Sequence, residues 1–317
     1  MFKDSRVESD AISKNEFEAQ VPQLRVELIN AQYDLTSANF SVLILLAGND
    51  RIGVDQVADR INEWMDARYI DTRIFASPFQ EERQRPRFWR YWNALPAHGR
   101  TGLYGGAWPI NILADKINRN FKKKEFDNWI QRANYFEKKL TDDGTLVLKF
   151  WVTLPRKALK ERLKAAKKNP DRAWWINEQD WEVFERYDEI AKPTKKYIEE
   201  TDTPHAPWMV IDGTDASFRD LKIVTTIRDA ITGRLAEPAA SEQAQAVPIK
   251  YPDALGEVDL LQSLGKKEYK QKLDKYQRRF HRLMLKAHEA GVSPVLAFEG
   301  WDAGGKGGTI RRLTQAI

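Results

Sequence analysis

A glycine-rich run close to residue 300 constrains the fold of this chain more than any other feature. Residues 300–309 read Gly-Trp-Asp-Ala-Gly-Gly-Lys-Gly-Gly-Thr, after the apolar segment 294–298 and before a helical segment at 310–317. A glycine-rich turn between a buried strand and a helix points backbone N–H groups at one place, where the helix dipole adds positive charge. The pattern predicts a phosphate-binding loop with these members: Gly300, Gly304, Gly305, Lys306, Gly307, Gly308 and Thr309. A merely flexible glycine turn is the alternative.

Three side chains in this loop carry the expected chemistry. Lys306 adds a cation at the phosphate position, and Gly307 replaces the Ser or Thr that usually follows such a lysine, so we assign the magnesium-binding hydroxyl to Thr309. Asp302 is unusual, because phosphates repel a nearby carboxylate unless a divalent metal or a proton intervenes. We interpret Asp302 as a Mg²⁺ ligand or as a base for an acceptor phosphate, with a plain turn residue as the alternative.

The composition limits the classes of protein to which the chain can belong. Its 317 residues suggest roughly two domains, and 42% of them are apolar, which suffices for a core. There is no cysteine, which excludes disulfides and thiolate metal sites and favours a reducing cytoplasm. No targeting segment or membrane span is predicted, since apolar runs such as 42–47 are far too short for a bilayer. The net charge of +5 favours a polyanionic ligand.

A related pattern lies 252 residues earlier in the chain. The helical stripe before the loop recurs at that offset, and three loop residues match as well. The stripe is Tyr269, Leu273, Tyr276, Phe280 and Leu283 in one copy and Phe17, Val21, Leu24, Leu28 and Ala31 in the other; Gly48, Asp50 and Gly53 match Gly300, Asp302 and Gly305. The sequence therefore predicts an internal duplication, with a period too long for a solenoid.

Strands and helices alternate between the two copies. The expected strands are 42–46, 72–76, 101–104, 146–152 and 208–211, and the expected helices are 55–67, 87–95, 126–140, 156–168, 178–200 and 218–233. This alternation predicts an α/β fold, with a parallel sheet that helices cover on both faces.

The domain boundaries follow from a change in composition. Residues 235–254 are rich in Ala, Glu, Gln and Pro and read as a linker. We predict a degenerate first domain at 1–234 and the start of a second, catalytic-type domain at 255–317. Only eight residues follow Thr309, so we expect the second copy to be incomplete.

The first copy lacks the cation of its loop. It keeps Gly48, Asp50 and Gly53, but Val54 and Val57 stand at the positions of the second copy's lysine and threonine. A charged hydrogen bond worth about 1.5–3 kcal/mol is lost with the lysine. We interpret this loop as a structural relic that still turns the chain tightly.

Basic residues cluster at 156–172, and two interpretations of them stay open. Such a run is usually a solvated helix face, but with the arginines at 83, 85, 87 and 90 it could grip a string of phosphates. The candidate phosphate contacts are Lys164, Lys167, Lys168 and Arg172. A nucleic-acid partner is disfavoured, since no recognition helix, zinc-ligand spacing or RNA-binding signature is found.

Three motifs resemble those of the polyphosphate kinase 2 family. The run 300–313 resembles the family's phosphate-binding loop, and Leu-Val-Leu-Lys-Phe-Trp at 146–151 and Thr-Asp-Thr-Pro-His-Ala-Pro-Trp at 201–208 resemble its later signatures. The similarity covers nearly the whole chain outside the linker. Two fused copies are similar to the polyphosphate:AMP phosphotransferase branch of the family, in which the second copy is taken to be catalytic.

The resemblance implies a P-loop kinase architecture with a helical lid, and Mg²⁺ as cofactor. It places Asp302 near the metal and the acceptor phosphate, Lys306 on the transferring phosphates, and the backbone of 304–308 around them. The family's Asp-Arg-Ser-Trp motif falls on Gly105, Gly106, Ala107 and Trp108 in the first copy, where only the tryptophan survives. The first copy is therefore expected to be inactive at both loops.

The resemblance also implies the reaction and the partners. The complete protein would transfer the terminal phosphoryl group of inorganic polyphosphate to AMP, or to another nucleotide, and would bind neither nucleic acid nor membranes. The first copy would complete a pseudo-dimer within the chain and guide polyphosphate through its basic residues; a homo-oligomer stays open. The alternative, which we favour for the 317 residues alone, is a non-catalytic pseudo-kinase module that binds polyphosphate or a partner.

Overall fold

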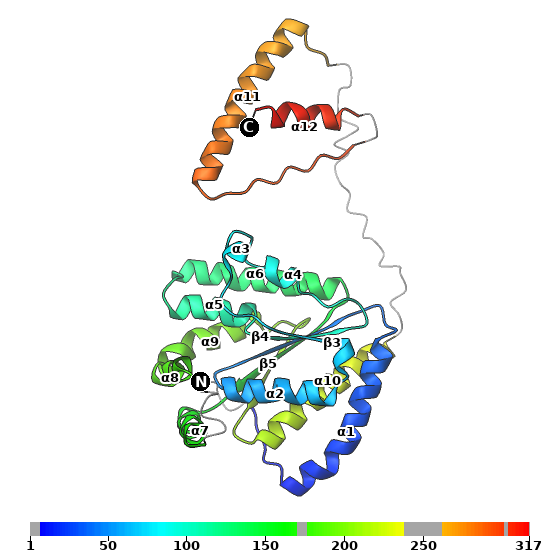
Figure 1. Cartoon of the computed structure of the whole chain (residues 1–317), viewed down its shortest axis with the longest axis vertical. Coiled ribbons are helices and arrows are strands. Elements are labelled where there is room, and N and C mark those ends of the chain that lie inside the picture. The colour runs from blue at the N-terminus through cyan, green and yellow to red at the C-terminus, as the bar shows by residue number, and fades with distance from the viewer. Residues whose placement is uncertain (1–6, 170–175, 238–261, 301–303, 317) are drawn as a thin grey trace. The chain divides into compact units, whose positions relative to one another are not determined.

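The computed structural model describes residues 7–169, 176–237, 262–300 and 304–316 (Figure 1). Contacts divide the chain into two compact units, Met1–Glu242 and Gln243–Ile317, which we describe separately. Most of the predicted linker 235–254 lies outside the described residues, so the predicted domain boundaries stay predictions.

A parallel six-stranded sheet forms the centre of the first unit, among the residues described. The strands lie in the order β1-β6-β5-β2-β4-β3, and all neighbours pair in parallel. In the central register, Ile44 is opposite Leu103 on one side and Leu148 on the other. The strands are β1 (Val7–Glu8), β2 (Val42–Gly48), β3 (Ile70–Ile74), β4 (Thr101–Gly105), β5 (Leu146–Thr153) and β6 (Trp208–Asp212).

Helices cover both faces of this sheet, which confirms the predicted α/β class. Strand β2 is buried on both sides: Val42, Ile44 and Leu46 belong to one core cluster, and the residues between them belong to the other. Figure 1 shows the two helical layers on opposite sides of the sheet. One layer holds α1 (Lys14–Leu35), α2 (Arg51–Trp64) and α10 (Ala216–Ala236); the other holds α4 (Trp89–Trp92), α5 (Trp108–Ile117), α6 (Lys123–Asp142) and α9 (Tyr187–Thr201).

Two further helices, α7 (Arg156–Lys168) and α8 (Glu178–Glu185), pack outside these layers. Their apolar side chains form a separate cluster with Ile52, Leu154 and Tyr187 near the carboxyl end of the sheet. We call α7 and α8 the lid helices. Helix α7 has the bounds predicted for it, and α8 begins at an asparagine cap, where Asn177 Oδ1 accepts a hydrogen bond from the Asp180 N–H at 3.1 Å.

Three predicted helices are wrong in detail. The helix expected at 87–95 is only α4, preceded by the short α3 (Gln80–Arg83), and Pro96 disfavours helical backbone at the residue before it. The helix expected at 178–200 is two helices, α8 and α9, because the backbone of Arg186 leaves the helical range at φ −92° and ψ 17°. A 3₁₀ turn at Ala67–Tyr69 occupies the end of the helix expected at 55–67.

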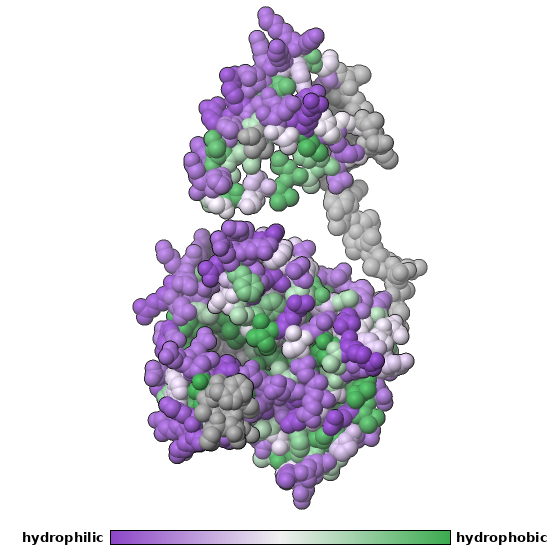
Figure 2. Space-filling model, viewed as in Figure 1, coloured by the Kyte–Doolittle hydropathy of each residue, from purple (hydrophilic) through white to green (hydrophobic). Residues whose placement is uncertain are grey.

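The second unit consists of α11 (Lys266–Glu289), an extended segment and α12 (Lys306–Thr314). Gln277 Nε2 donates to the Arg312 carbonyl at 2.7 Å and so links the two helices. In Figure 2 hydrophilic side chains cover the outer side of α11, and apolar side chains gather on the side of α12. The predicted helical stripe of Tyr269, Leu273 and their partners lines this inner side.

The apolar segment 294–298 is the place where the phosphate-loop pattern predicts a buried strand before the loop. These residues have no strand structure, and the side chain of Val295 is 91% exposed. A β-strand is stabilised by hydrogen bonds to a neighbouring strand, and no such neighbour exists in the described part of this unit.

No helix among the described residues is long and apolar enough to cross a membrane.

Candidate phosphate-binding sites

The glycine-rich loop of the second unit leads directly into α12. Gly305 is the residue before the helix and has a φ of +86°, a left-handed conformation that glycine adopts without a steric cost. The Lys306 ammonium folds back and donates to the carbonyl oxygen of Gly300, which closes the loop. The first glycine, the lysine and the helix start therefore lie close together in the structure.

The start of α12 presents backbone N–H groups to solvent. The Thr309 N–H makes the first backbone bond of the helix, to the Gly305 carbonyl at 3.0 Å. The N–H groups of Gly307 and Gly308 precede that bond and therefore have no acceptor within the helix. Both glycines are exposed, so an anion can approach these N–H groups closely.

The structure bears on only one of the two residues predicted to bind Mg²⁺, Thr309. The Thr309 hydroxyl donates its hydrogen to the Gly305 carbonyl at 3.1 Å. The hydroxyl oxygen therefore still has lone pairs that can bind a cation at the start of α12. Asp302 lies outside the described residues, and no group of three or more acidic, histidine or cysteine side chains that could hold a metal occurs in the described ranges. The roles of Asp302, Lys306 and Thr309 stay predictions.

The corresponding loop of the first unit makes a tight turn after β2, as expected for Gly48. A Cβ atom at this position would lie 2.2 Å from the carbonyl oxygen of Val152, so only glycine permits this approach to β5. The next residue, Asn49, binds the backbone of Leu154 twice: its Nδ2 donates to the carbonyl at 3.0 Å, and its Oδ1 accepts from the N–H at 2.8 Å. The turn is thereby fixed to the end of β5.

Asp50 fills the space at the start of α2. Its side chain is 1% exposed, and a Cβ atom built on Gly53 would lie 2.1 Å from Asp50 Oδ2, which places the carboxylate against the first turn of the helix. Arg162 of lid helix α7 pairs with the same oxygen. Burial raises the pKa of Asp50, and the positive charge of Arg162 opposes that rise.

No cation from the loop itself reaches this site in the described structure. Val54 packs against the core that lies between α2 and the sheet, and Val57 is fully buried in it. The cation near Asp50 comes from the lid instead, and a second guanidinium, that of Arg219 in α10, lies close by, with Nη1 3.0 Å from a Cβ atom built on Gly53.

The second degenerate motif of the first unit is a plain structural turn. Gly105 ends β4, and Gly106 has a φ of +61° and leaves no room for a Cβ atom, which would lie 2.8 Å from the Phe75 carbonyl oxygen. Trp108, the residue that survives from the family pattern, is buried and donates from Nε1 to Glu137 at 2.9 Å. These residues build the core and offer neither the carboxylate nor the guanidinium of the motif.

The basic residues divide into two groups. The four upstream arginines are engaged within the protein: Arg83 with the Pro78 carbonyl, Arg85 with Glu81, Arg87 with Asp115, and Arg90 with Glu82. Lys164, Lys167 and Lys168 are exposed on α7, and the Lys167 ammonium lies 5.8 Å from the centroid of the Trp181 ring. Arg172 lies outside the described residues.

Sequence reasoning missed the role of Arg162. It counted this residue among the solvated or phosphate-gripping cations, yet its guanidinium points inward to Asp50 and to the Gly213 carbonyl, at 2.7 Å from the latter. A signal was present, because Arg162 follows Leu159 by three residues and precedes Leu163, which puts it beside the buried face of α7.

The comparison with known families is decisive for the affiliation of the chain. A model of the polyphosphate kinase 2 (PPK2) family matches residues 11–238 and 263–317. The chain belongs to the polyphosphate kinase 2 family. This confirms the resemblance expected from the three sequence motifs.

Curated relatives of this PPK2 chain include two proteins named polyphosphate:AMP phosphotransferase. The one from Pseudomonas aeruginosa is 36% identical and the one from Pseudomonas syringae pv. tomato 33% identical, each over the whole chain. The chain spans 65% of the length of each of these two relatives.

Solved structures confirm the fold. A crystal structure of a polyphosphate kinase 2 from Pseudomonas aeruginosa superposes with a TM-score of 0.80 at 34% identity, and covers 99% of this chain and 62% of its own. A polyphosphate kinase 2 from Arthrobacter aurescens superposes with a TM-score of 0.69 at 21% identity, over 73% of this chain and 86% of its own, and supports the fold alone.

Proposed function

We propose that this chain is part of a polyphosphate-dependent nucleotide phosphotransferase that transfers the terminal phosphoryl group of inorganic polyphosphate to AMP and forms ADP. The observation that carries the proposal is the loop at 300–309, which has both a lysine and an exposed helix start, as a phosphate site requires. The names of the relatives supply the two substrates. They also argue against the pseudo-kinase alternative, because they match the chain over its full length.

The second unit would supply the catalytic contacts. The N–H groups of Gly307 and Gly308 would bind phosphate oxygens, and Lys306 would leave the Gly300 carbonyl to neutralise the transferring group. A bound Mg²⁺ would neutralise further phosphate charge, and Asp302 and Thr309 are the residues that we propose to hold it. Positioning and electrostatic stabilisation account for most of the catalysis in phosphoryl transfer, so no covalent intermediate is implied.

The first unit would have a supporting role. We infer that it takes the place of a second subunit and that its exposed lysines on α7 guide polyphosphate. The cysteine-free composition suits a reducing cytoplasm, where we place the protein.

A transfer assay tests the reaction. The protein with its complete second domain is incubated with polyphosphate, Mg²⁺ and either AMP, ADP or GMP, and the phosphorylated nucleotide is quantified. The Lys306→Met variant should lose at least about 100-fold in kcat/KM, because a charge-stabilising contact to the transferring phosphates disappears. The matched control is Lys275→Met, since Lys275 is an exposed lysine of α11. Transfer that survives Lys306→Met would refute the choice of site.

A second assay tests the guiding role of the lid lysines. Replacing Lys164, Lys167 and Lys168 together by Met should raise the KM for polyphosphate about three- to tenfold and leave the KM for AMP unchanged, since exposed charges mainly steer encounter. The triple replacement of Lys122, Lys123 and Lys124 is the control, because it removes the same charge from an exposed run at the start of α6. Equal effects of the two triple variants would contradict a specific role for α7.

A further inference from the structure

The lid helices of the first unit are bound to its phosphate-loop turn by two ion pairs. In the first, the Arg162 guanidinium from α7 reaches Asp50 and also donates to the Gly213 carbonyl at 2.7 Å. In the second, Arg51 at the start of α2 donates from Nε and Nη2 to the two carboxylate oxygens of Asp180 in α8, at 2.8 and 2.7 Å. Each lid helix therefore has its own charged link to the residues that directly follow β2.

In both ion pairs the carboxylate is the buried partner. Asp50 is 1% exposed and Asp180 is 7% exposed, so neither carboxylate can exchange its arginine for water without a rearrangement. Ile52 directly follows the two loop residues of these links, Asp50 and Arg51, and its side chain belongs to the apolar cluster of the lid helices. Charged and apolar contacts thus hold the lid in the same place.

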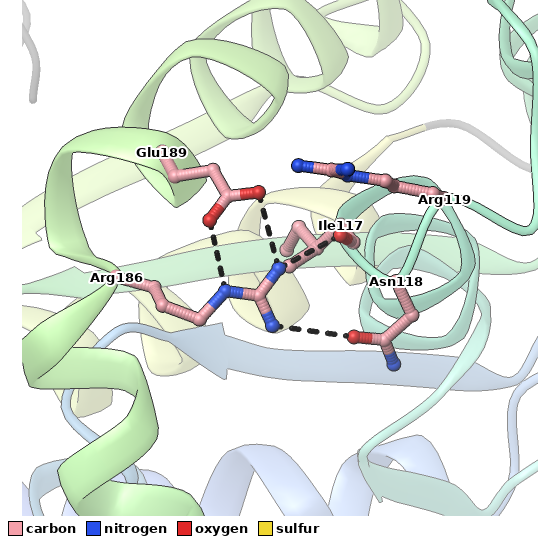
Figure 3. A pocket seen from close by; sticks show the side chains of 5 residues that line it. All are labelled: Ile117, Asn118, Arg119, Arg186 and Glu189. Atoms are coloured by element: carbon pink, nitrogen blue, oxygen red, sulfur yellow. Dashed lines mark hydrogen bonds and ion pairs between the residues drawn. The ribbon is translucent and has the colours of Figure 1, made fainter.

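The base of the lid is fixed as well. The Tyr187 hydroxyl donates to the Leu154 carbonyl at 2.9 Å, at the point where the chain enters the lid. Figure 3 shows Arg186, between α8 and α9, with its guanidinium turned to both carboxylate oxygens of Glu189. The same guanidinium donates to the Ile117 carbonyl at 2.8 Å and so joins the lid base to the end of α5.

The Asp50 carboxylate, which matches Asp302 of the second unit in sequence, turns onto its own helix start, the part of a phosphate loop whose N–H groups bind an anion. It lies against the first turn of α2, and two guanidinium groups approach it, from Arg162 and from the 1% exposed Arg219. The Arg219 guanidinium is already paired with Asp220 at 2.7 Å, which leaves Arg162 as the cation available at this position. A helix start with a nearby cation attracts a phosphate, but the carboxylate of Asp50 already lies there and repels a second anion.

We propose that Asp50 is a built-in anion that fills the phosphate position of the first unit and, through Arg162, latches the lid helices shut. The first unit then stays closed without a ligand, unlike a lid that opens and closes around a substrate. The exposed lysines of α7 consequently stay on the outer surface. The proposal concerns the first unit alone and holds or fails independently of the reaction proposed above.

Hydrogen exchange of the full chain, followed by mass spectrometry, tests the filled site without any variant. Tripolyphosphate is the probe, and peptides that cover 48–57 are the readout, because binding at the exposed α7 lysines does not protect them. We expect their exchange rates to change less than about twofold on addition of the probe. A slowing of about tenfold or more would show that the loop binds phosphate and would overturn the proposal.

A pair of variants tests the latch. Arg162→Met should raise exchange in α7 by at least about tenfold, because the buried link is lost. Arg156→Met, on the same helix, removes an ion pair to Asp188 that is largely exposed, and should change exchange less than about twofold. Equal responses of the two variants would overturn the latch.

A third variant covers the case in which Arg162→Met loosens the whole unit, which faster exchange in β2 would reveal. Arg51→Met cuts the link from α8, keeps Asp50 paired and leaves the capping box of Asn177 and Asp180 at the start of α8 in place. Faster exchange of α8 alone, by about tenfold, then supports the latch, and unchanged exchange of α8 contradicts it.

Discussion

Replacement of Lys149 by methionine should destabilise the first unit severely. Lys149 lies on β5, and its ammonium donates to Glu137 Oε2 at 2.6 Å and to the Thr201 carbonyl at 2.7 Å. Glu137 also accepts from Trp108 Nε1 at 2.9 Å, and the side chains of the ion pair are both 0% exposed. The pair therefore joins β5, α5, α6 and α9 within the core.

The expected loss of stability follows from two large energies of the Lys149–Glu137 pair: the attraction between the charges and the cost of removing both ions from water. At 2.6 Å and an effective dielectric constant of 20, the attraction between the two charges is about 6 kcal/mol. The removal of both ions from water costs several kcal/mol each, so the net contribution of the intact pair is small. Lys149→Met removes the attraction but leaves the Glu137 charge buried, and the free energy of unfolding should fall by about 3–5 kcal/mol.

A double-mutant cycle separates the pair from the packing around it. Glu137→Gln removes the negative charge but keeps an acceptor for Trp108, so the double variant has neither a buried charge nor an orphaned indole N–H. We expect it to be more stable than either single variant, with a coupling free energy of at least about 2 kcal/mol.

The assay is urea unfolding of the full chain, followed by tryptophan fluorescence. All but one of the 11 tryptophans precede residue 242, so the signal reports the first unit. If the double variant is destabilised by the sum of the two single effects, the two residues do not act as a pair, and the reasoning is refuted.

Three other substitutions test the loop of the first unit. Gly48→Ala should lower the free energy of unfolding by more than about 2 kcal/mol, because the new Cβ meets the Val152 carbonyl, whereas Gly233→Ala in open space on α10 should raise it by up to about 1 kcal/mol; urea titration checks both. Asn49→Ala should cost about 2–3 kcal/mol through two lost backbone hydrogen bonds, and a smaller urea effect would contradict this. Because burial raises the pKa of Asp50 above 3.8, the folded state binds more protons just above that pH, and the group's contribution to stability falls as the pH rises there. The free energy of unfolding of the wild type, relative to Asp50→Asn, should therefore fall between about pH 3.5 and pH 6; a rise would refute the assigned direction.

The fold of the first unit could be predicted because its signals are local and repeated. The apolar run at 42–46 and the strands after it alternate with amphipathic helices, and that alternation fixes a parallel sheet with two covered faces. One error lies where a long-range contact decides. The run 294–298 has the composition of a strand, but strand structure depends on a pairing partner that sequence periodicity does not supply.

The candidate sites could be predicted only in part, for a similar reason. The glycines at 48, 53 and 305 are recognisable in sequence because each has a local backbone or packing requirement. The partner of Asp50 is 112 residues away in sequence, and a run of similar cations surrounds it. Composition cannot say which of these cations faces inward; only the apolar positions beside Arg162 indicate it.

The loss of the loop lysine and the closed lid of the first unit are physically connected. A carboxylate at the start of α2 cannot stay ionised and buried without a nearby cation. The second copy has a lysine in its own loop, but the first has Val54 at that position, so the cation for Asp50 must come from another element. Arg162 is that cation, and because it belongs to the lid, the same contact that opposes the burial-induced rise in the pKa of Asp50 also holds the lid against the turn. A Val54→Lys change alone would therefore not restore a phosphate site, since Asp50 and Arg162 would still occupy the position.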